Sequence, residues 1–242
     1  MGRQAPKATS TRHSRLRRGR LLGLVIALGC CGASALPAAA AAKTKTVDGC
    51  KLKPHANCSH RQLIQARLKS ADLAGANVSF AKFIQAEMQH VDLKGANAQH
   101  ADFGQTHLEH ANLSGANLSG AELTQAYLQG ANLVGATFSH TSFTQAYLQN
   151  ADLEGDDLTS VELIQASLAN TNFKDANLSG QELYGNPPGG NDYAGANLSG
   201  AKLIGNFASD SFAGANFSGA EFCNATIEGT LRNTGCPSGY YP

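Results

Sequence analysis

From Cys58 onward the sequence repeats every five residues. A large apolar residue occupies the central position of each repeat, and Leu or Phe fills 28 of the 35 central positions between Cys58 and Ile227. The residue two places earlier is Ala in 23 of the 35 repeats, as in the segment ANLSG at residues 116–120. The spacing is broken once, by a four-residue step from Leu203 to Phe207. This regularity constrains the fold more strongly than the composition does.

A period of five residues excludes the common regular structures. Five residues turn an α-helix through about 140°, so an apolar stripe would wander around the helix surface. In a continuous strand, an odd period would turn every second central residue outward. A short extended segment followed by a bend satisfies the pattern. The Ala then occupies a small inward position, the residue between it and the central residue faces outward, and the last two residues form a corner.

A second period of 20 residues shows how many repeats complete one coil. Because residues 20 apart are equivalent, four repeats form a coil with four faces, and about nine coils stack at a strand spacing of about 4.8 Å. We expect stacked glutamine amides to hydrogen-bond along the stack as a ladder. The glutamines of this period are Gln65, Gln85, Gln105, Gln125, Gln145 and Gln165.

The A-(D/N)-(L/F)-x-x pattern resembles the pentapeptide-repeat family over about residues 56–231. The resemblance implies an all-β fold, a right-handed quadrilateral β-helix whose interior is filled by the central residues and the Ala before them. We place the β-helix at residues 58–231, with caps at 43–57 and 232–242. The core residues expected in its middle are Leu113, Leu118, Leu123, Leu128, Leu133, Phe138 and Phe143.

Two irregularities interrupt the repeats near their C-terminal end. Pro188 occupies a central position within residues 184–192, where we expect a loop or bulge because proline cannot donate to a strand ladder. The four-residue step before Phe207 should kink or shift one corner.

Residues 1–42 have the pattern of a secretory signal peptide. A basic segment is followed by the apolar run at residues 21–28 and by small residues that end at 38–42. An alternative is a lipoprotein signal, which would leave Cys30 lipidated. No later segment is long and apolar enough to be a membrane span. We therefore expect an exported protein, periplasmic or extracellular, or anchored by lipid through Cys30.

Four cysteines remain after the leader, and they lie in two close pairs at the ends of the repeats. Export permits disulfides, and four cysteines allow three pairings. Local pairing within each close pair is favoured, while zinc is less favoured because no Cys-x-x-Cys spacing occurs. The candidates are Cys50, Cys58, Cys223 and Cys236.

The repeat region is acidic. Between Ala71 and Thr230 there are 17 acidic and four basic residues, a net charge of −13. Such a body repels phosphate backbones, so direct nucleic-acid binding is not expected. No catalytic nucleophile motif, phosphate loop or HExxH motif is present, and neither enzyme activity nor a cofactor is predicted.

Two groups of side chains are candidates for surface binding. His90 and His110 lie one coil apart, with His107 nearby, and this is the only spacing compatible with a metal ion. The outward residues Tyr127 and Tyr147 should stack into an aromatic strip that contacts a partner or a sugar ring. Solvated corner residues and simple stabilisation between strands are the alternative interpretations.

The leading functional hypothesis is a non-enzymatic exported protein that offers acidic faces to another protein or to a cell-envelope component. Some members of the resembled family imitate duplex DNA and bind topoisomerases, so a DNA mimic is the second hypothesis. Export would separate such a mimic from a cytoplasmic topoisomerase. A weak metal-binding surface protein is the third.

Overall fold

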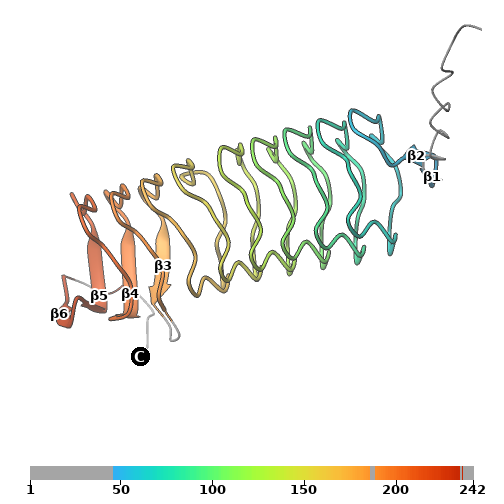
Figure 1. Cartoon of the computed structure of the whole chain (residues 1–242). Helices are drawn as coiled ribbons and strands as arrows, with labels where there is room; N and C mark the ends of the chain where they lie inside the picture. The colour runs from blue at the N-terminus through green and yellow to red at the C-terminus, as the bar shows by residue number, and fades with distance from the viewer. Residues whose placement is uncertain (1–45, 186–188, 235, 237–242) are drawn as a thin grey trace, which may run out of the picture. The chain divides into compact units, whose positions relative to one another are not determined.

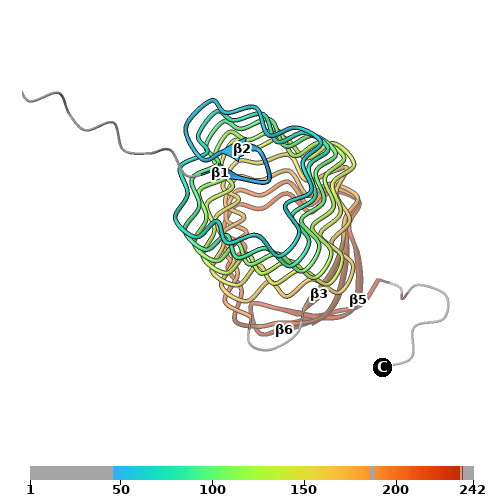
Figure 2. The same cartoon turned by 90° about the vertical axis from the view of Figure 1, so that its right-hand side faces the viewer.

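The computed structural model describes residues 46–185, 189–234 and 236, which belong to one compact unit, Lys43–Pro242. Within these ranges the regular structure is β throughout, without a helix. The chain winds into stacked coils, shown from the side in Figure 1 and after a 90° turn in Figure 2. No helix of the described part has the length and hydropathy needed to cross a bilayer. The signal peptide and Pro188 predictions fall outside the described residues.

Hydrogen bonds between the backbones of successive coils hold the stack together. The outward residues form parallel bridges with residues 20 positions later, in columns that begin at Asn57, Gln62, Arg67 and Asp72. In a typical contact, Leu63 N donates to Lys82 O at 2.7 Å, and Asn77 N donates to Ala56 O at 2.8 Å. Because each coil is paired on both sides, its backbone groups are satisfied without a helix or a long strand.

Each repeat ends in a tight turn. Ala66 N donates to Leu63 O at 3.1 Å, and the last residue of the repeat, Gln65, has φ 55°. The outward Asn or Asp supports the turn with its side chain, as when Asn117 Oδ1 accepts from Ser119 N at 3.1 Å. This local bond explains why Asn and Asp are frequent at the outward position.

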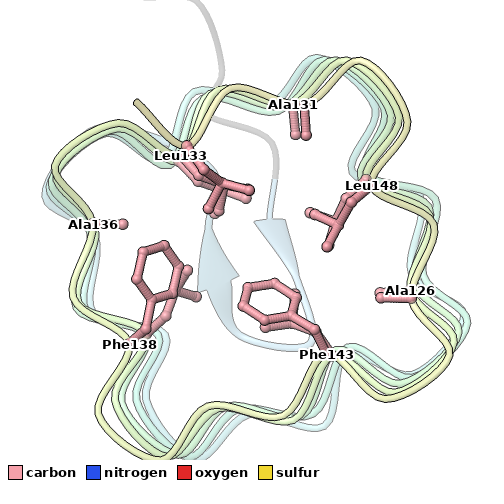
Figure 3. Packing of buried hydrophobic residues seen from close by; sticks show 14 of the residues in the cluster. Ala126, Ala131, Leu133, Ala136, Phe138, Phe143 and Leu148 are labelled. Carbon is pink, nitrogen blue, oxygen red and sulfur yellow. The ribbon is translucent and has the colours of Figure 1, made fainter. Parts of the chain in front are cut away.

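The interior is filled by the central residues, with Ala between them (Figure 3). The seven core residues expected from the sequence, Leu113 to Phe143 in steps of five, are at most 2% exposed. Aromatic rings stack from coil to coil, as Phe83 does on Phe103 at 5.0 Å between centroids. Each buried Leu or Phe contributes about 1.5–3 kcal/mol to stability.

Longer strands replace one corner near the C-terminal end. Strands β3 (Glu182–Gly185), β4 (Lys202–Phe207) and β5 (Glu221–Ile227) run parallel, and β6 (Thr230–Arg232) pairs antiparallel with β5. The register of β4 and β5 shifts between Ile204 and Asn206. The four-residue step at this point leaves no room for a turn, so β4 runs through the corner from Leu203 to Phe207.

A strand pair and a disulfide lie at each end of the repeats. Strands β1 (Thr46–Val47) and β2 (Cys50–Lys51) form an antiparallel pair, and Cys50 is bonded to Cys58. At the other end Cys223 is bonded to Cys236, beside β6. Of the three possible pairings, the structure contains the local one. Both ends thus have additional chain tied to coils that would otherwise present unpaired edges.

We predict that Leu128→Asp will unfold the repeats cooperatively. Leu128 is fully buried, so the substitution removes apolar contacts and buries a carboxylate without a partner, at a cost of about 3–5 kcal/mol or more. The measurement is thermal and urea unfolding followed by circular dichroism. Val134→Asp, at a position that is 36% exposed, is the control and should change the midpoint little. An unchanged midpoint in Leu128→Asp would contradict the packed interior.

Candidate binding surface

The glutamine column forms a continuous ladder of side-chain amides on one corner of the coils. In each step Nε2 of one glutamine donates to Oε1 of the glutamine 20 residues later, at 2.8–3.0 Å, from Gln65 through to Gln165. The bonds are solvent-exposed and repeat at the coil spacing. Because each amide keeps one free N–H, the ladder presents a row of equally spaced donors.

A stack of three rings runs beside this ladder on the column that begins at Arg67. The ring centroids of His107 and Tyr127 are 4.6 Å apart, those of Tyr127 and Tyr147 are 5.0 Å apart, and both ring pairs are within 5° of parallel. Each ring therefore covers a face of its neighbour. A sugar stacks on a ring face, so the strip offers mainly ring edges to a ligand.

A shallow groove of about 520 Å³ lies between the ladder and the rings. It is open to solvent and mostly polar, which suits hydrogen bonding better than the capture of an apolar ligand. The residues that line it are Gln85, Gln105, His107, Gln125, Tyr127 and Tyr147.

A second aromatic stack lies on another corner and was not anticipated from the sequence. Phe80, a corner residue, lies between His60 and His100 with ring centroids 4.9 Å from each. His100 in turn lies against Gly120, where an added Cβ would meet the imidazole ring. The sequence does carry a signal for this stack, because His60, Phe80 and His100 are 20 residues apart and therefore share a column.

The predicted metal candidates do not converge on one point. The rings of His90 and His110 stack at 5.2 Å between centroids, while His107 Nδ1 lies 2.9 Å from Glu109 Oε1. Among the described residues, no three side chains of His, Cys, Asp or Glu are placed to hold a metal ion.

Two acidic residues, Asp156 and Asp210, occupy small inward positions and are buried. Asp156 is 3% exposed; its Oδ1 accepts from Gly135 N at 2.7 Å, and its Oδ2 is buried without a partner in the described structure. Burial raises the pKa of Asp156 to about 7. The hydrogen bond from Gly135 N lowers this pKa, but by less than burial raises it. Burial also raises the pKa of Asp210. With a pKa near 7, the Asp156 carboxyl is only partly ionised at neutral pH.

Comparison with known proteins identifies the repeats. A family model described as pentapeptide repeats matches eight copies, over residues 55–89, 86–125, 121–155, 157–185 and 194–230. No curated protein matches the chain significantly.

Several solved structures are similar to the chain. One is HetL, a pentapeptide repeat protein involved in heterocyst differentiation regulation in the cyanobacterium Nostoc, with 26% identity over 74% of this chain and 92% of that one, and a TM-score of 0.27. QnrB1, a plasmid-mediated fluoroquinolone resistance protein, has 17% identity over 65% and 87% of the chains and a TM-score of 0.37. A thylakoid-lumen pentapeptide repeat protein of Arabidopsis thaliana has 20% identity over 50% and 71%, with a TM-score of 0.21.

We predict that Gly120→Ala will destabilise the protein more than Gly115→Ala. Both glycines have positive φ, 67° and 64°, so both substitutions carry a backbone cost of about 1–2 kcal/mol. Only Gly120 is covered by His100, and nothing lies within 4 Å of a Cβ at Gly115. Loss of ring stacking should add about 0.5–1.5 kcal/mol, measured by urea unfolding. In a His100→Ala background, Gly120→Ala and Gly115→Ala should destabilise the protein equally. If Gly120→Ala were still the more destabilising there, contact with His100 would not be the cause.

We predict that Asp156→Asn will stabilise the protein increasingly as pH rises from about 5 to 8. A folded pKa near 7, above the ordinary value of 3.8, means that the folded state favours the protonated acid, so stability is lost as pH rises through 7. The measurement is the difference in unfolding free energy between variant and wild type at each pH. Asp157→Asn, at the exposed neighbouring position, is the control. A difference that does not depend on pH would argue against a buried, ionisable Asp156.

Proposed function

This chain belongs to the pentapeptide repeat family, and from that premise we propose that it is a non-enzymatic, exported protein that presents acidic faces to a binding partner. The partner is another protein or a component of the cell envelope. We propose that the chain folds as a right-handed, quadrilateral β-helix of about nine coils. Each of the four columns of bridges would then run along one face.

The filled interior is the observation that carries the proposal. Central residues from successive coils occupy the axis as one continuous cluster of buried side chains. Catalytic sites usually need a concave pocket that excludes water, whereas most polar side chains described here lie on solvated outer faces or in an open groove. Recognition through the outer faces is therefore the function best supported.

Export is supported by two observations of different kinds. The leader at residues 1–42 has the composition of a signal peptide, with lipidation at Cys30 as the alternative. The disulfides Cys50–Cys58 and Cys223–Cys236 are typical of oxidising compartments.

The charge of the repeats favours a basic partner surface. A net charge of −13 between Ala71 and Thr230 accelerates encounter with a positive surface and opposes binding to nucleic acid. The same charge favours a second candidate function, imitation of DNA toward a DNA-processing enzyme such as a topoisomerase. Neutral residues interrupt the acidic ones, as where Asn112 Nδ2 donates to Asp92 Oδ1 at 3.1 Å.

Fractionation of cells that produce the full-length chain separates these two functions. We expect the protein in the envelope or the medium with its leader removed and its disulfides formed. A cytoplasmic protein with an intact leader would contradict export and favour the DNA mimic. Mass spectrometry of the N-terminus and thiol labelling supply the two readouts.

We predict that capture of a partner from envelope extracts depends on the acidic residues of the column of bridges that begins at Gln62. The variant Asp102→Asn, Glu122→Gln, Glu162→Gln neutralises three of these residues without changing their size. Capture by this variant should fall at low salt, because the acids attract the partner, and wild-type capture should weaken at high salt. The control is Gln62→Asn, a neutral change in the same column. Equal capture by wild type and the neutralised variant would contradict an acidic binding face.

A further inference from the structure

Two neighbouring coils separate on one face near the C-terminal end of the repeats. In the preceding pair of coils, Phe143 N donates to Glu162 O and Gln145 N donates to Ile164 O, both at 2.8 Å. One coil further on, the equivalent bonds from Leu163 N and Gln165 N toward β3 are absent within the described chain. The segment from Leu163 to the turn residue Gln165 therefore faces β3 with two backbone donors that have no partner among the described residues.

The side chain of Gln181 accounts for this separation. Thr106, Thr141 and Thr171 occupy equivalent small inward positions, and each hydroxyl donates to the carbonyl 23 residues earlier at 2.6–2.9 Å. Gln181 makes the same bond, from Nε2 to Leu158 O at 2.8 Å, and a further one to Val161 O at 3.2 Å. In the other coils, the equivalent of Val161 O accepts from a backbone N–H of the next coil, as Arg61 O does from Lys82 N. Here the longer side chain of Gln181 donates to Val161 O instead, and so holds the coils apart.

The separation leaves a cleft of about 560 Å³. Leu163, Leu168 and Leu183 lie in its wall, and Ile164 is 58% exposed at its mouth. The bond from Asn170 N to Gly189 O, at 3.1 Å, joins the coils again beyond Leu168. The cleft is thus lined by both apolar and polar side chains, and the backbone of residues 163–165 lies along one side of it.

We propose that this cleft is a docking site for a short extended peptide with alternating apolar and basic residues. β3 is the edge strand of its sheet, bonded to β4 on one side only. Leu163 N and Gln165 N face the same side of their coil, as the equivalent donors Phe143 N and Gln145 N do one coil earlier. A peptide strand entering here accepts from Leu163 N and Gln165 N through its own main chain, a recurring mode of peptide recognition.

The side chains around the cleft specify the sequence of the peptide. In β3, Leu183 is buried and Glu182 is exposed, so an added strand also directs alternate side chains inward and outward. The inward residues contact leucines. The outward residues lie between the exposed carboxylates Glu162 and Glu182, while the cleft lining includes no Lys or Arg. In the peptide, apolar residues therefore alternate with lysine or arginine.

This inference rests on the proposed function, because it names the chemistry of one partner segment. The probe is a fluorescent, end-blocked hexapeptide of alternating valine and lysine, and binding to the full mature chain is measured by fluorescence anisotropy. Two peptides serve as controls: one with glutamate in place of lysine, and one with the lysines retained and alternate backbone nitrogens methylated. Docking as a strand predicts that each control binds at least tenfold more weakly.

Two variants test the location of the site. Ile164→Lys places a like charge at the mouth and should weaken binding at least tenfold, while Ile64→Lys, in the same column and 46% exposed, should not. Gln181→Thr keeps the bond to Leu158 O with a shorter side chain, so it should close the cleft, abolish binding and raise the unfolding midpoint. Amide hydrogen exchange provides a second readout, with Leu163 and Gln165 protected only when the peptide is bound.

Three outcomes would overturn the docking site. These are equal binding by the methylated peptide, equal loss of binding in Ile64→Lys and Ile164→Lys, and no binding by wild type. The first two would show attraction to the acidic surface alone. If wild type captures the envelope partner but does not bind the peptide, the proposed function stands and only the cleft is wrong. Loss of envelope capture by wild type would count against the proposed function itself.

Discussion

The hydrogen bonds between successive coils determine the rest of this structure. They require the backbones of neighbouring coils to lie at strand spacing, about 4.8 Å, on every face. That spacing leaves room for only a small side chain at the inward position before each central residue. Ala satisfies this limit in 23 of 35 repeats, and the threonines that replace it bond to a carbonyl below without displacing the coil. A side chain that exceeds the limit must open the stack.

Two exceptions show what happens when the limit is exceeded. At Asp156 the carboxylate accepts from Gly135 N, and the bridge expected between Thr137 and Asp157 is missing among the described bridges. At Gln181 the amide donates to the carbonyls of Leu158 and Val161 in the coil below, and Leu163 N and Gln165 N have no backbone partner among the described residues. The first exception buries an ionisable group, whereas the second opens a cleft. Each local feature follows from one side chain that is too long or too polar for its position.

Much of this architecture could be predicted from the sequence because it depends on spacing alone. The five-residue period indicates the bend, the 20-residue period indicates which residues stack, and the glutamine ladder follows from both. The local cysteine pairs followed from their closeness in sequence and their place at the ends of the repeats. Family membership was evident from the same pattern, and the family model covers most of the repeats.

The features that could not be predicted depend on lengths and directions of side chains rather than on spacing. In the sequence, Gln181 and Thr171 are both polar exceptions to Ala, and only the structure shows that one fits and the other separates the coils. The stack of Phe80 between His60 and His100 differs from these features, because the 20-residue spacing already places the three residues in one column. The stacking of Tyr127 on Tyr147, by contrast, was expected from their shared column.

The most direct test of the stacked coils is a pair of distances between spin labels in one column. Gln62, Ser142 and Glu162 belong to the same column of bridges. Ser142 lies four coils from Gln62, and Glu162 lies five coils from it. With labels at 62 and 142, and then at 62 and 162, pulsed electron spin resonance should give separations near 19 and 24 Å, an increase of about 4.8 Å for 20 residues. An unchanged separation, or an increase several times larger, would contradict a chain that closes one coil every 20 residues.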